Sequence, residues 1–279
     1  TDYLVRSSSS SSQASKHSPQ IGGYFYTEYF QTEEKKINFD LHYLAFAVSG
    51  WASDNIQYVG EFELEHGGKG DNTFVEQAYL DYWFMDNIAL KIGGMLTPFN
   101  RFDEFHDPLT NHSVSRPLMA REIGVSAWKD VGVDLHGYFN FMTSNALSFD
   151  LYAINGLGEG ATLRGSRQYR DNNEKLSIGT RLAFLVQNKV ELGASFYQGA
   201  WSNDGKNDLI MLGAHFILPT RFIDIYGEFS QATSENPGDI EEGEMTGYFI
   251  EASKLYKYKF RPSVRYGALD YLDAGSEFG

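Results

Sequence analysis

Apolar side chains recur at every second position along most of this sequence, in segments of about ten residues. In one such segment Ile223, Ile225 and Phe229 alternate with Asp224 and Glu228. A period of two residues is that of a β-strand, and about ten residues is the length with which a tilted strand crosses a bilayer. The charged face of each segment suits contact with water better than a packed core. The pattern therefore predicts strands that separate an apolar environment from an aqueous one.

Roughly thirteen segments of this kind follow one another, and the connections between them alternate in length. Short turns are expected after the even-numbered segments, and longer polar loops, of which 98–129 is the longest, after the odd-numbered ones. Short turns at one rim and long loops at the other are typical of outer-membrane β-barrels. The predicted strands lie near residues 21–31, 37–52, 56–67, 73–85, 88–97, 130–140, 146–154, 175–187, 189–200, 208–218, 221–231, 246–255 and 257–267.

A soluble β-sandwich also has alternating strands and frequent turns, and it is the main alternative fold. The connections of a sandwich have no reason to alternate in length, however. The predicted outward faces also end in aromatic side chains such as Tyr82, Phe84 and Tyr248, as the aromatic girdles of membrane barrels do. We therefore predict an all-β protein, an antiparallel transmembrane β-barrel. Residues 1–20, with their six consecutive serines, are expected to form a flexible tail, and residues 21–279 a single barrel domain.

Composition excludes several classes of protein. The chain has no run of about 18 apolar residues, so a helical membrane span is not expected. It has no cysteine, which excludes disulfides, thiolate zinc sites and a cysteine nucleophile. Its net charge of -14 argues against nucleic acid as a partner, because phosphate binding needs an excess of Lys and Arg.

Two stretches carry a family resemblance: IQYVGEFELEHGG, with the following VEQAYLDYWFMDNIALKIGGMLTPFN, and the later TGYFIEASKLYKYKFRPSVRYGALDY. The chain resembles the phosphate-selective porin family and its porin-like relatives. The resemblance implies a bacterial outer-membrane location, a barrel of about 16 strands, often trimeric, and passive passage of small hydrophilic solutes or ions. Phosphate selectivity is not implied, because no lysine ladder follows successive strands. Since single-chain bacterial barrels normally have an even number of strands, we expect further closing strands or a partner that supplies the closing edge.

The long loop 98–129 is the first candidate functional segment. In porins the third long loop commonly folds into the lumen and sets its narrowest point, and a loop of this length is more often functional than structural filler. Its charged side chains are therefore the candidates for a pore constriction. They are Arg101, Asp103, Glu104, Asp107, Arg116 and Arg121.

Charged side chains on the predicted inner faces are the second candidate set. Glu61, Glu63 and Glu65 share one face of a strand and form an acidic column. A basic column is expected far along the chain, with isolated basic residues on other strands. Facing columns would create a transverse field that selects ions, or each charge pairs with a neighbour and only hydrates the lumen; the sequence leaves both open. The basic residues are Lys91, Arg181, Lys259, Arg261 and Arg265.

Metal binding and catalysis have weaker support. Acidic and histidine residues cluster in the long loop, but their spacing matches no standard metal-binding loop, so no metal or cofactor is predicted. His42, His136 and His215 are dispersed and are interpreted as hydrated lumen residues. No G-x-S-x-G or H-E-x-x-H motif occurs, so an enzyme is not expected. A barrel filled by a partner, or a structural subunit of a larger envelope complex, is the alternative to a channel. The loop cluster comprises Asp103, Glu104, His106, Asp107 and His112.

Overall fold

The computed structural model describes residues 17–31, 38–68, 73–107, 110–111, 113, 115–236, 243–257 and 260–271. These residues form a sheet of 13 strands in which every strand is hydrogen-bonded to its neighbours in the sequence. All of the pairings are antiparallel. The strands are β1 (Gln20–Phe30), β2 (Asn38–Trp51), β3 (Ile56–Glu65), β4 (Thr73–Met85), β5 (Ile88–Leu96), β6 (Lys129–Phe141), β7 (Asn145–Ile154), β8 (Ser177–Val186), β9 (Val190–Ala200), β10 (Asp208–Pro219), β11 (Asp224–Ser234), β12 (Gly243–Ser253) and β13 (Ser263–Tyr271).

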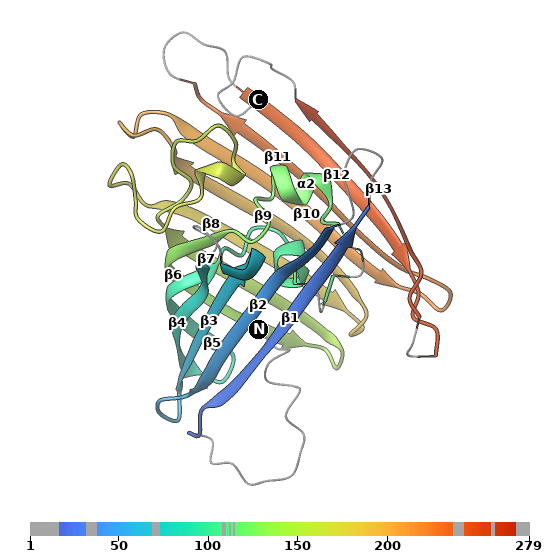
Figure 1. Cartoon of the computed structure of the whole chain (residues 1–279). Coiled ribbons are helices and arrows are strands. Elements are labelled where there is room, and N and C mark those ends of the chain that lie inside the picture. Colours follow the sequence, from blue (N-terminus) through green and yellow to red (C-terminus); the bar gives the residue numbers. More distant parts are fainter. Residues whose placement is uncertain are drawn as a thin grey trace.

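The sheet curls around a concave interior, with β1 and β13 at its two edges (Figure 1). Among the described residues no ladder joins these two strands, so the sheet is not closed. The all-β antiparallel fold is confirmed, whereas closure by further strands or by a partner stays a prediction. None of the described helices is long and apolar enough to cross a bilayer.

The two faces of the sheet differ as the alternation predicts. On β4, Leu80 is 52% exposed on the convex face, whereas Tyr79 and Asp81 on the concave face are 6% and 4% exposed. The same contrast recurs at the edge of the sheet, where Val264 of β13 is exposed and Glu251 of the adjacent β12 is buried. Apolar groups therefore cover the outside of the sheet, and charged groups point to its interior.

The connection between β12 and β13 differs from the prediction. A short turn at 256 was expected, but the strands are separated by residues 254–262, within which Tyr256 and Phe260 form an isolated bridge. Pro262 has no amide hydrogen to donate to a ladder, and β13 begins just after it. The predicted strand 257–267 is therefore wrong in its first half, and the observed strand lies several residues later.

Short helical turns occur in the loops. They are η1 (His66–Gly68), η2 (Phe102–Phe105), α2 (Leu118–Glu122) and η3 (Arg164–Ser166). Both η2 and α2 belong to residues 97–128, the connection between β5 and β6. We call this segment the inner loop, because α2 lies on the concave side of the sheet (Figure 1) and the segment supplies seven of the buried residues of the main apolar cluster.

Candidate functional site

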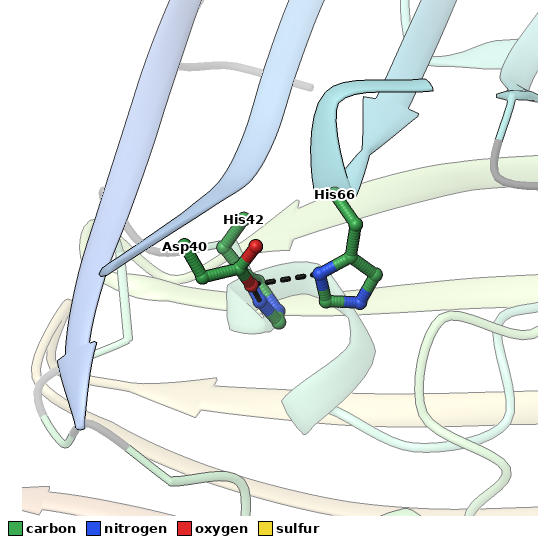
Figure 2. Close-up of side chains that lie close together, drawn as sticks. All are labelled: Asp40, His42 and His66. Carbon is green, nitrogen blue, oxygen red and sulfur yellow. Dashed lines mark hydrogen bonds and ion pairs between the residues drawn. The ribbon is translucent and has the colours of Figure 1, made fainter. Parts of the chain in front are cut away.

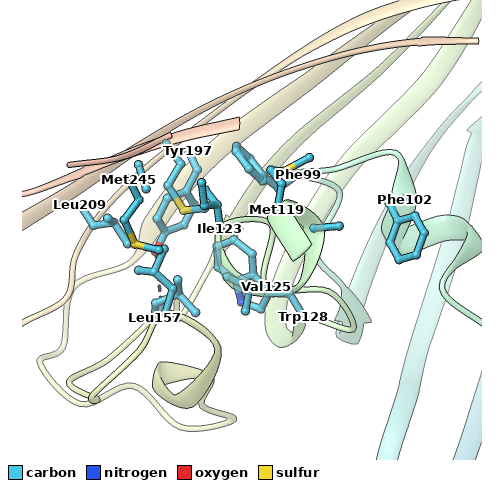
Figure 3. Close-up of a cluster of buried hydrophobic side chains, with 14 of the residues drawn as sticks. Phe99, Phe102, Met119, Ile123, Val125, Trp128, Leu157, Tyr197, Leu209 and Met245 are labelled. Atoms are coloured by element: carbon cyan, nitrogen blue, oxygen red, sulfur yellow. Dashed lines mark hydrogen bonds between the residues drawn. The ribbon is translucent and has the colours of Figure 1, made fainter. Parts of the chain in front are cut away.

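The inner loop is anchored by apolar packing to one part of the barrel wall. Met119, Ile123 and Trp128 are fully buried among side chains of β7 and β9–β12 (Figure 3). The indole of Trp128 packs edge-on against the ring of Tyr197, with the ring centroids 5.0 Å apart. Gly247 of β12 makes room for the side chain of Met119, since a Cβ at position 247 would lie 3.0 Å from Cγ of Met119. The packing fixes the position of α2 against the wall.

Hydrogen bonds and ion pairs hold the loop to the same region of the wall. Arg101 Nε lies 2.6 Å from Glu191 Oε1, and the backbone amide of Phe102 donates to Glu228 Oε1 at 2.6 Å. Arg265 of β13 donates to the backbone carbonyl of Ser115 at 2.5 Å. These contacts come from β9, β11 and β13.

The loop also contacts the first strands of the sheet. His106 Nε2 lies 3.2 Å from Glu76 Oε1 of β4, and the hydroxyl of Tyr24 in β1 donates to Asp107 Oδ1 at 3.0 Å. Arg116 donates to the hydroxyl of Tyr43 in β2 at 3.0 Å. Because the same segment is bonded to β1, β2 and β4 and also to β9, β11 and β13, it spans the interior of the sheet.

A β-bulge prepares the wall for these contacts. Between Glu61 and Phe62 the β3–β4 register shifts, so Gln77 faces Glu61, Val75 faces Phe62, and Glu76 is the additional residue. Strict alternation would point Glu76 and Gln77 to opposite faces, but both are buried on the inner side. The bulge thereby brings the Glu76 carboxylate to the inner loop, a placement that the period of two does not predict.

Lys129, the first residue of β6, completes a buried charge cluster. Its ammonium group pairs with Glu76 and lies 3.4 Å from Glu63 Oε2. All three side chains are less than a tenth exposed. Since His106 pairs with the same Glu76, two basic and two acidic side chains meet where the inner loop joins β3, β4 and β6.

Two titratable groups of the inner loop have shifted pKa values. Burial raises the pKa of Asp103 to about 6, although His106 and the amide of Ala127 act in the opposite direction. Burial alone would lower the pKa of His106, but the nearby carboxylates of Asp107 and Glu76 raise it to about 9. At neutral pH, His106 is therefore a cation, and the ion pair with Glu76 is formed.

The raised pKa of His106 predicts a pH-dependent stability. Because its folded pKa of about 9 exceeds the ordinary 6.5, the contribution is complete below pH 6.5 and is lost as the pH rises through 9. This pKa shift corresponds to a contribution of about 3 kcal/mol to the free energy of unfolding. We expect the urea midpoint of the folded protein to fall between pH 6.5 and pH 10. In His106→Gln this fall should be much smaller, and an equal fall in both proteins would contradict the assignment.

The predicted constriction residues differ in how they are bonded and how far they are exposed. Arg101, Asp103, Asp107 and Arg116 are all bonded within the interior, Asp103 through its Oδ1, which accepts from the amide of Ala127 at 3.1 Å. The side chain of Glu104 is not among those described. Arg121 lies on α2, where it is half exposed and 2.6 Å from its neighbour Glu122.

The predicted lumen charges pair with adjacent strands. Lys91 lies 3.5 Å from Asp134, Arg181 lies 3.1 Å from Asp150, and Arg265 lies 2.6 Å from Glu251. Of the acidic column, Glu61 accepts from Gln77, Glu63 faces Lys129, and Glu65 is half-buried. Arg261 precedes β13 and lies 3.5 Å from Ser253 Oγ, and Lys259 is outside the described residues. The sequence left open whether the lumen charges form facing columns or pair with neighbours. In the structure, Lys91, Arg181 and Arg265 pair with neighbours.

A cavity of about 290 Å³ adjoins the inner loop. Arg101 and Arg181 both line it, and so do the acids with which they pair, Glu191 and Asp150. Its remaining walls come from β4, β6, β7 and β8, near the short turns. One residue of each predicted charge set therefore reaches the same space.

Sequence reasoning missed the wall residues that hold the loop. Glu76, Glu191 and Glu228 are acidic residues of alternating strands, and nothing local distinguishes them from other inner-face charges. The interpretation of His42 as a dispersed residue is wrong, because its ring lies 5.0 Å from that of His66. His215 is buried and pairs with Glu191, and His136 pairs with Asp81. His112 of the loop cluster lies outside the described residues.

Comparisons with known proteins agree with this architecture. The model of the family described as phosphate-selective porin O and P matches residues 20–217. An uncharacterized protein of Aquifex aeolicus (strain VF5) is 27% identical over 241 residues, which is 78% of this chain and 54% of that protein. The chain thus spans about half the length of this curated relative.

Two solved structures with little sequence similarity align with this chain. The anion-selective porin from Comamonas acidovorans aligns with a TM-score of 0.66 at 10% identity, covering 91% of this chain and 79% of that chain. The trimer form of OmpT, an outer membrane protein of Vibrio cholerae, aligns with a TM-score of 0.47 at 12% identity, covering 93% and 92%. The fold comparison rests on the first of these two structures.

Proposed function

Because the chain belongs to the phosphate-selective porin O and P family of the bacterial outer membrane, we propose that it is a channel for passive diffusion. Small hydrophilic solutes or ions pass through a water-filled lumen, and the inner loop is its constriction. The observation that carries this proposal is the anchoring of residues 97–128 to both sides of the interior.

The anchoring supports a constriction because it keeps a long segment across the path of a solute. Apolar packing of Met119 and Trp128 holds one part of the loop, and the ion pair of His106 with Glu76 holds another. A segment held by burial and by ion pairs does not move out of the lumen without breaking several contacts at once. The width that the loop leaves open then sets the size limit for solutes.

Charges near the cavity support selection by electric field. Arg101 and Arg181 line it together with Glu191 and Asp150, so both signs face the same space. Inside a wall of low dielectric constant, such an arrangement orients dipolar solutes and favours one sign of ion. We propose that the arginines of the inner loop make the channel favour anions over cations. The paired lumen charges keep the wall hydrated.

The convex face and the family suggest the surroundings of the channel. The exposed apolar side chains of the strands suit contact with outer-membrane lipid. We propose a homotrimer as the assembly, in keeping with the family resemblance. A subunit role in a larger envelope complex, with the lumen filled by a partner, is the alternative.

Charge neutralisation in the inner loop tests the proposal. The triple variant Arg101→Gln, Arg116→Gln and Arg121→Gln of the full-length protein should shift ion selectivity toward cations. A change of about 1 kcal/mol in the energy of a unit charge, the order expected in water-like surroundings, alters the entry of each ion about fivefold. Because the change has opposite signs for cations and anions, their permeability ratio should change by up to about 25-fold. The measurement is the reversal potential in a planar bilayer under a salt gradient.

Two further measurements complete this test. Arg221→Gln is the matched control, because Arg221 lies exposed in the turn between β10 and β11 and its charge should not affect selectivity. The chain has no cysteine, so Arg121→Cys introduces a single thiol, and a charged thiol reagent should then reduce the current. Unchanged selectivity and unchanged current would remove the inner loop from the conduction path. An electrically silent wild-type protein would instead favour the partner-filled barrel.

A further inference from the structure

Asp40, His42 and His66 converge at the end of β2 and β3 that faces the long loops (Figure 2). Asp40 Oδ2 lies 3.1 Å from His42 Nδ1 and 2.7 Å from His66 Nδ1. These three atoms all lie within 4.8 Å of one another. The group adjoins Tyr43, which accepts a hydrogen bond from Arg116 of the inner loop, but none of its three residues takes part in the proposed diffusion path.

Two irregularities of the backbone bring these side chains together. The β1–β2 register shifts between Tyr26 and Thr27, so His42 is an additional residue in β2 and points to the same side as Tyr43. His66 follows the last residue of β3 with a φ of 49°, a left-handed conformation that few side chains adopt. Bulges and strained residues of this kind occur preferentially at functional sites.

Neighbouring aromatic rings hold His42 in place. Its imidazole packs edge-on against Tyr43, with the ring centroids 4.4 Å apart, and against Tyr26 at 6.0 Å. His66 is likewise edge-on to His42 at 5.0 Å. The Nδ1 atoms of both rings are thereby directed to the same carboxylate oxygen, while about half of the His66 side chain remains open to solvent.

A fourth potential ligand comes from β1. Glu28 is the residue directly opposite Asp40 in the β1–β2 ladder, and its Oε2 lies 3.6 Å from His42 Nδ1. Its side chain is only 12% exposed. Two imidazole nitrogens and two carboxylate oxygens therefore lie at the junction of three strands.

The distances suit a small divalent ion. In a tetrahedral zinc site, metal–ligand distances of about 2.0–2.2 Å place neighbouring ligand atoms about 3.3–3.6 Å apart. The Asp40–His42 and Glu28–His42 distances, 3.1 Å and 3.6 Å, are within a few tenths of an ångström of this spacing. The shorter Asp40–His66 distance needs only a small rotation of the exposed His66 ring.

We propose that Asp40, His42 and His66, with Glu28 as the fourth ligand, bind a divalent transition-metal ion, for which Zn²⁺ is the probe. Imidazole with carboxylate is a ligand set of zinc and its neighbours in the first transition row. The ion ties β1, β2 and the residue after β3 together at one rim. Because each ring must bind through an unprotonated Nδ1, protons compete with the metal and binding weakens as the pH falls.

Calorimetric titration of the folded, untagged protein with Zn²⁺ at neutral pH tests this site. We expect a single tight equivalent in the wild type and at least about a tenfold weaker affinity in His42→Ala and in His66→Ala. Glu28→Gln should weaken binding less than either of these. His17→Ala is the matched control, because His17 precedes β1 near the opposite rim, and its variant should bind Zn²⁺ as the wild type does.

A second measurement needs no variant and therefore does not depend on the folding of altered chains. Bound Zn²⁺ should protect His42 and His66 from modification by diethyl pyrocarbonate, as quantified by peptide mass spectrometry, while His17 stays reactive. The proposal is overturned if the wild type binds Zn²⁺ no more tightly than the double variant His42→Ala, His66→Ala. Equal protection of His17 would overturn it as well, because it would indicate nonspecific binding.

Discussion

Replacing Lys129 by methionine is expected to lower the free energy of unfolding by about 3–5 kcal/mol. The substitution preserves most of the side-chain volume but removes the cation that pairs with Glu63 and Glu76. Both carboxylates are almost completely buried, so they lose a partner without gaining water. The measurement is the urea unfolding transition of the folded protein in detergent or lipid at neutral pH.

The same substitution at an exposed lysine is the control for this prediction. Lys206 pairs with Asp204 in the loop between β9 and β10, where both side chains are open to solvent. Lys206→Met should leave the unfolding transition unchanged. Adding Glu63→Gln to Lys129→Met should recover part of the lost stability, because Glu63 loses its cationic partner Lys129 whereas Glu76 keeps its pair with His106. A loss of less than about 1 kcal/mol in Lys129→Met would show that the cluster is hydrated and not buried.

Replacing Met119 by alanine is expected to lower the free energy of unfolding by about 2–5 kcal/mol. The side chain is fully buried in the apolar cluster and touches Gly247 of β12, so its removal leaves a cavity between the inner loop and the wall. Because this packing holds α2, we also expect larger current fluctuations in planar bilayers. Unfolding in urea and single-channel recording measure the two effects.

Met142 provides a matched control for Met119. It lies in the turn between β6 and β7 with 83% of its surface exposed. Met142→Ala should change the unfolding free energy by no more than about 0.5 kcal/mol and should leave the current trace unchanged. Similar losses for the two variants would mean that the contact between the inner loop and the wall contributes little to stability.

Most strand positions could be predicted from the sequence because they depend on a local period. Predicted and observed ends agree within two residues for the segments from β1 to β10. Larger differences begin near Thr220. Its hydroxyl and amide are hydrogen-bonded to the backbone of Ile223 and close the turn 220–223. For this reason β11 begins at Asp224 and not at 221. Farther along the chain, β13 begins only at Ser263, directly after Pro262.

The candidate site could be predicted only in part. The length and composition of 98–129 indicated a functional loop, and Arg101, Asp103, Asp107 and Arg116 are in fact bonded inside the sheet. The partners on the wall could not be identified in the same way. The amide of Phe102 and the carboxylate of Glu228, for example, are 126 residues apart in the sequence.

By itself, the sequence determined that each strand has an apolar face and a charged face, since adjacent side chains of an extended chain point in opposite directions. It also determined that long and short connections alternate from β1 to β12. Only the tertiary structure decided which charges meet. A bulge of one residue turns Glu76 inward, and another places His42 beside His66. Register between strands and docking of a loop depend on the fit of distant surfaces, which no local pattern of residues encodes.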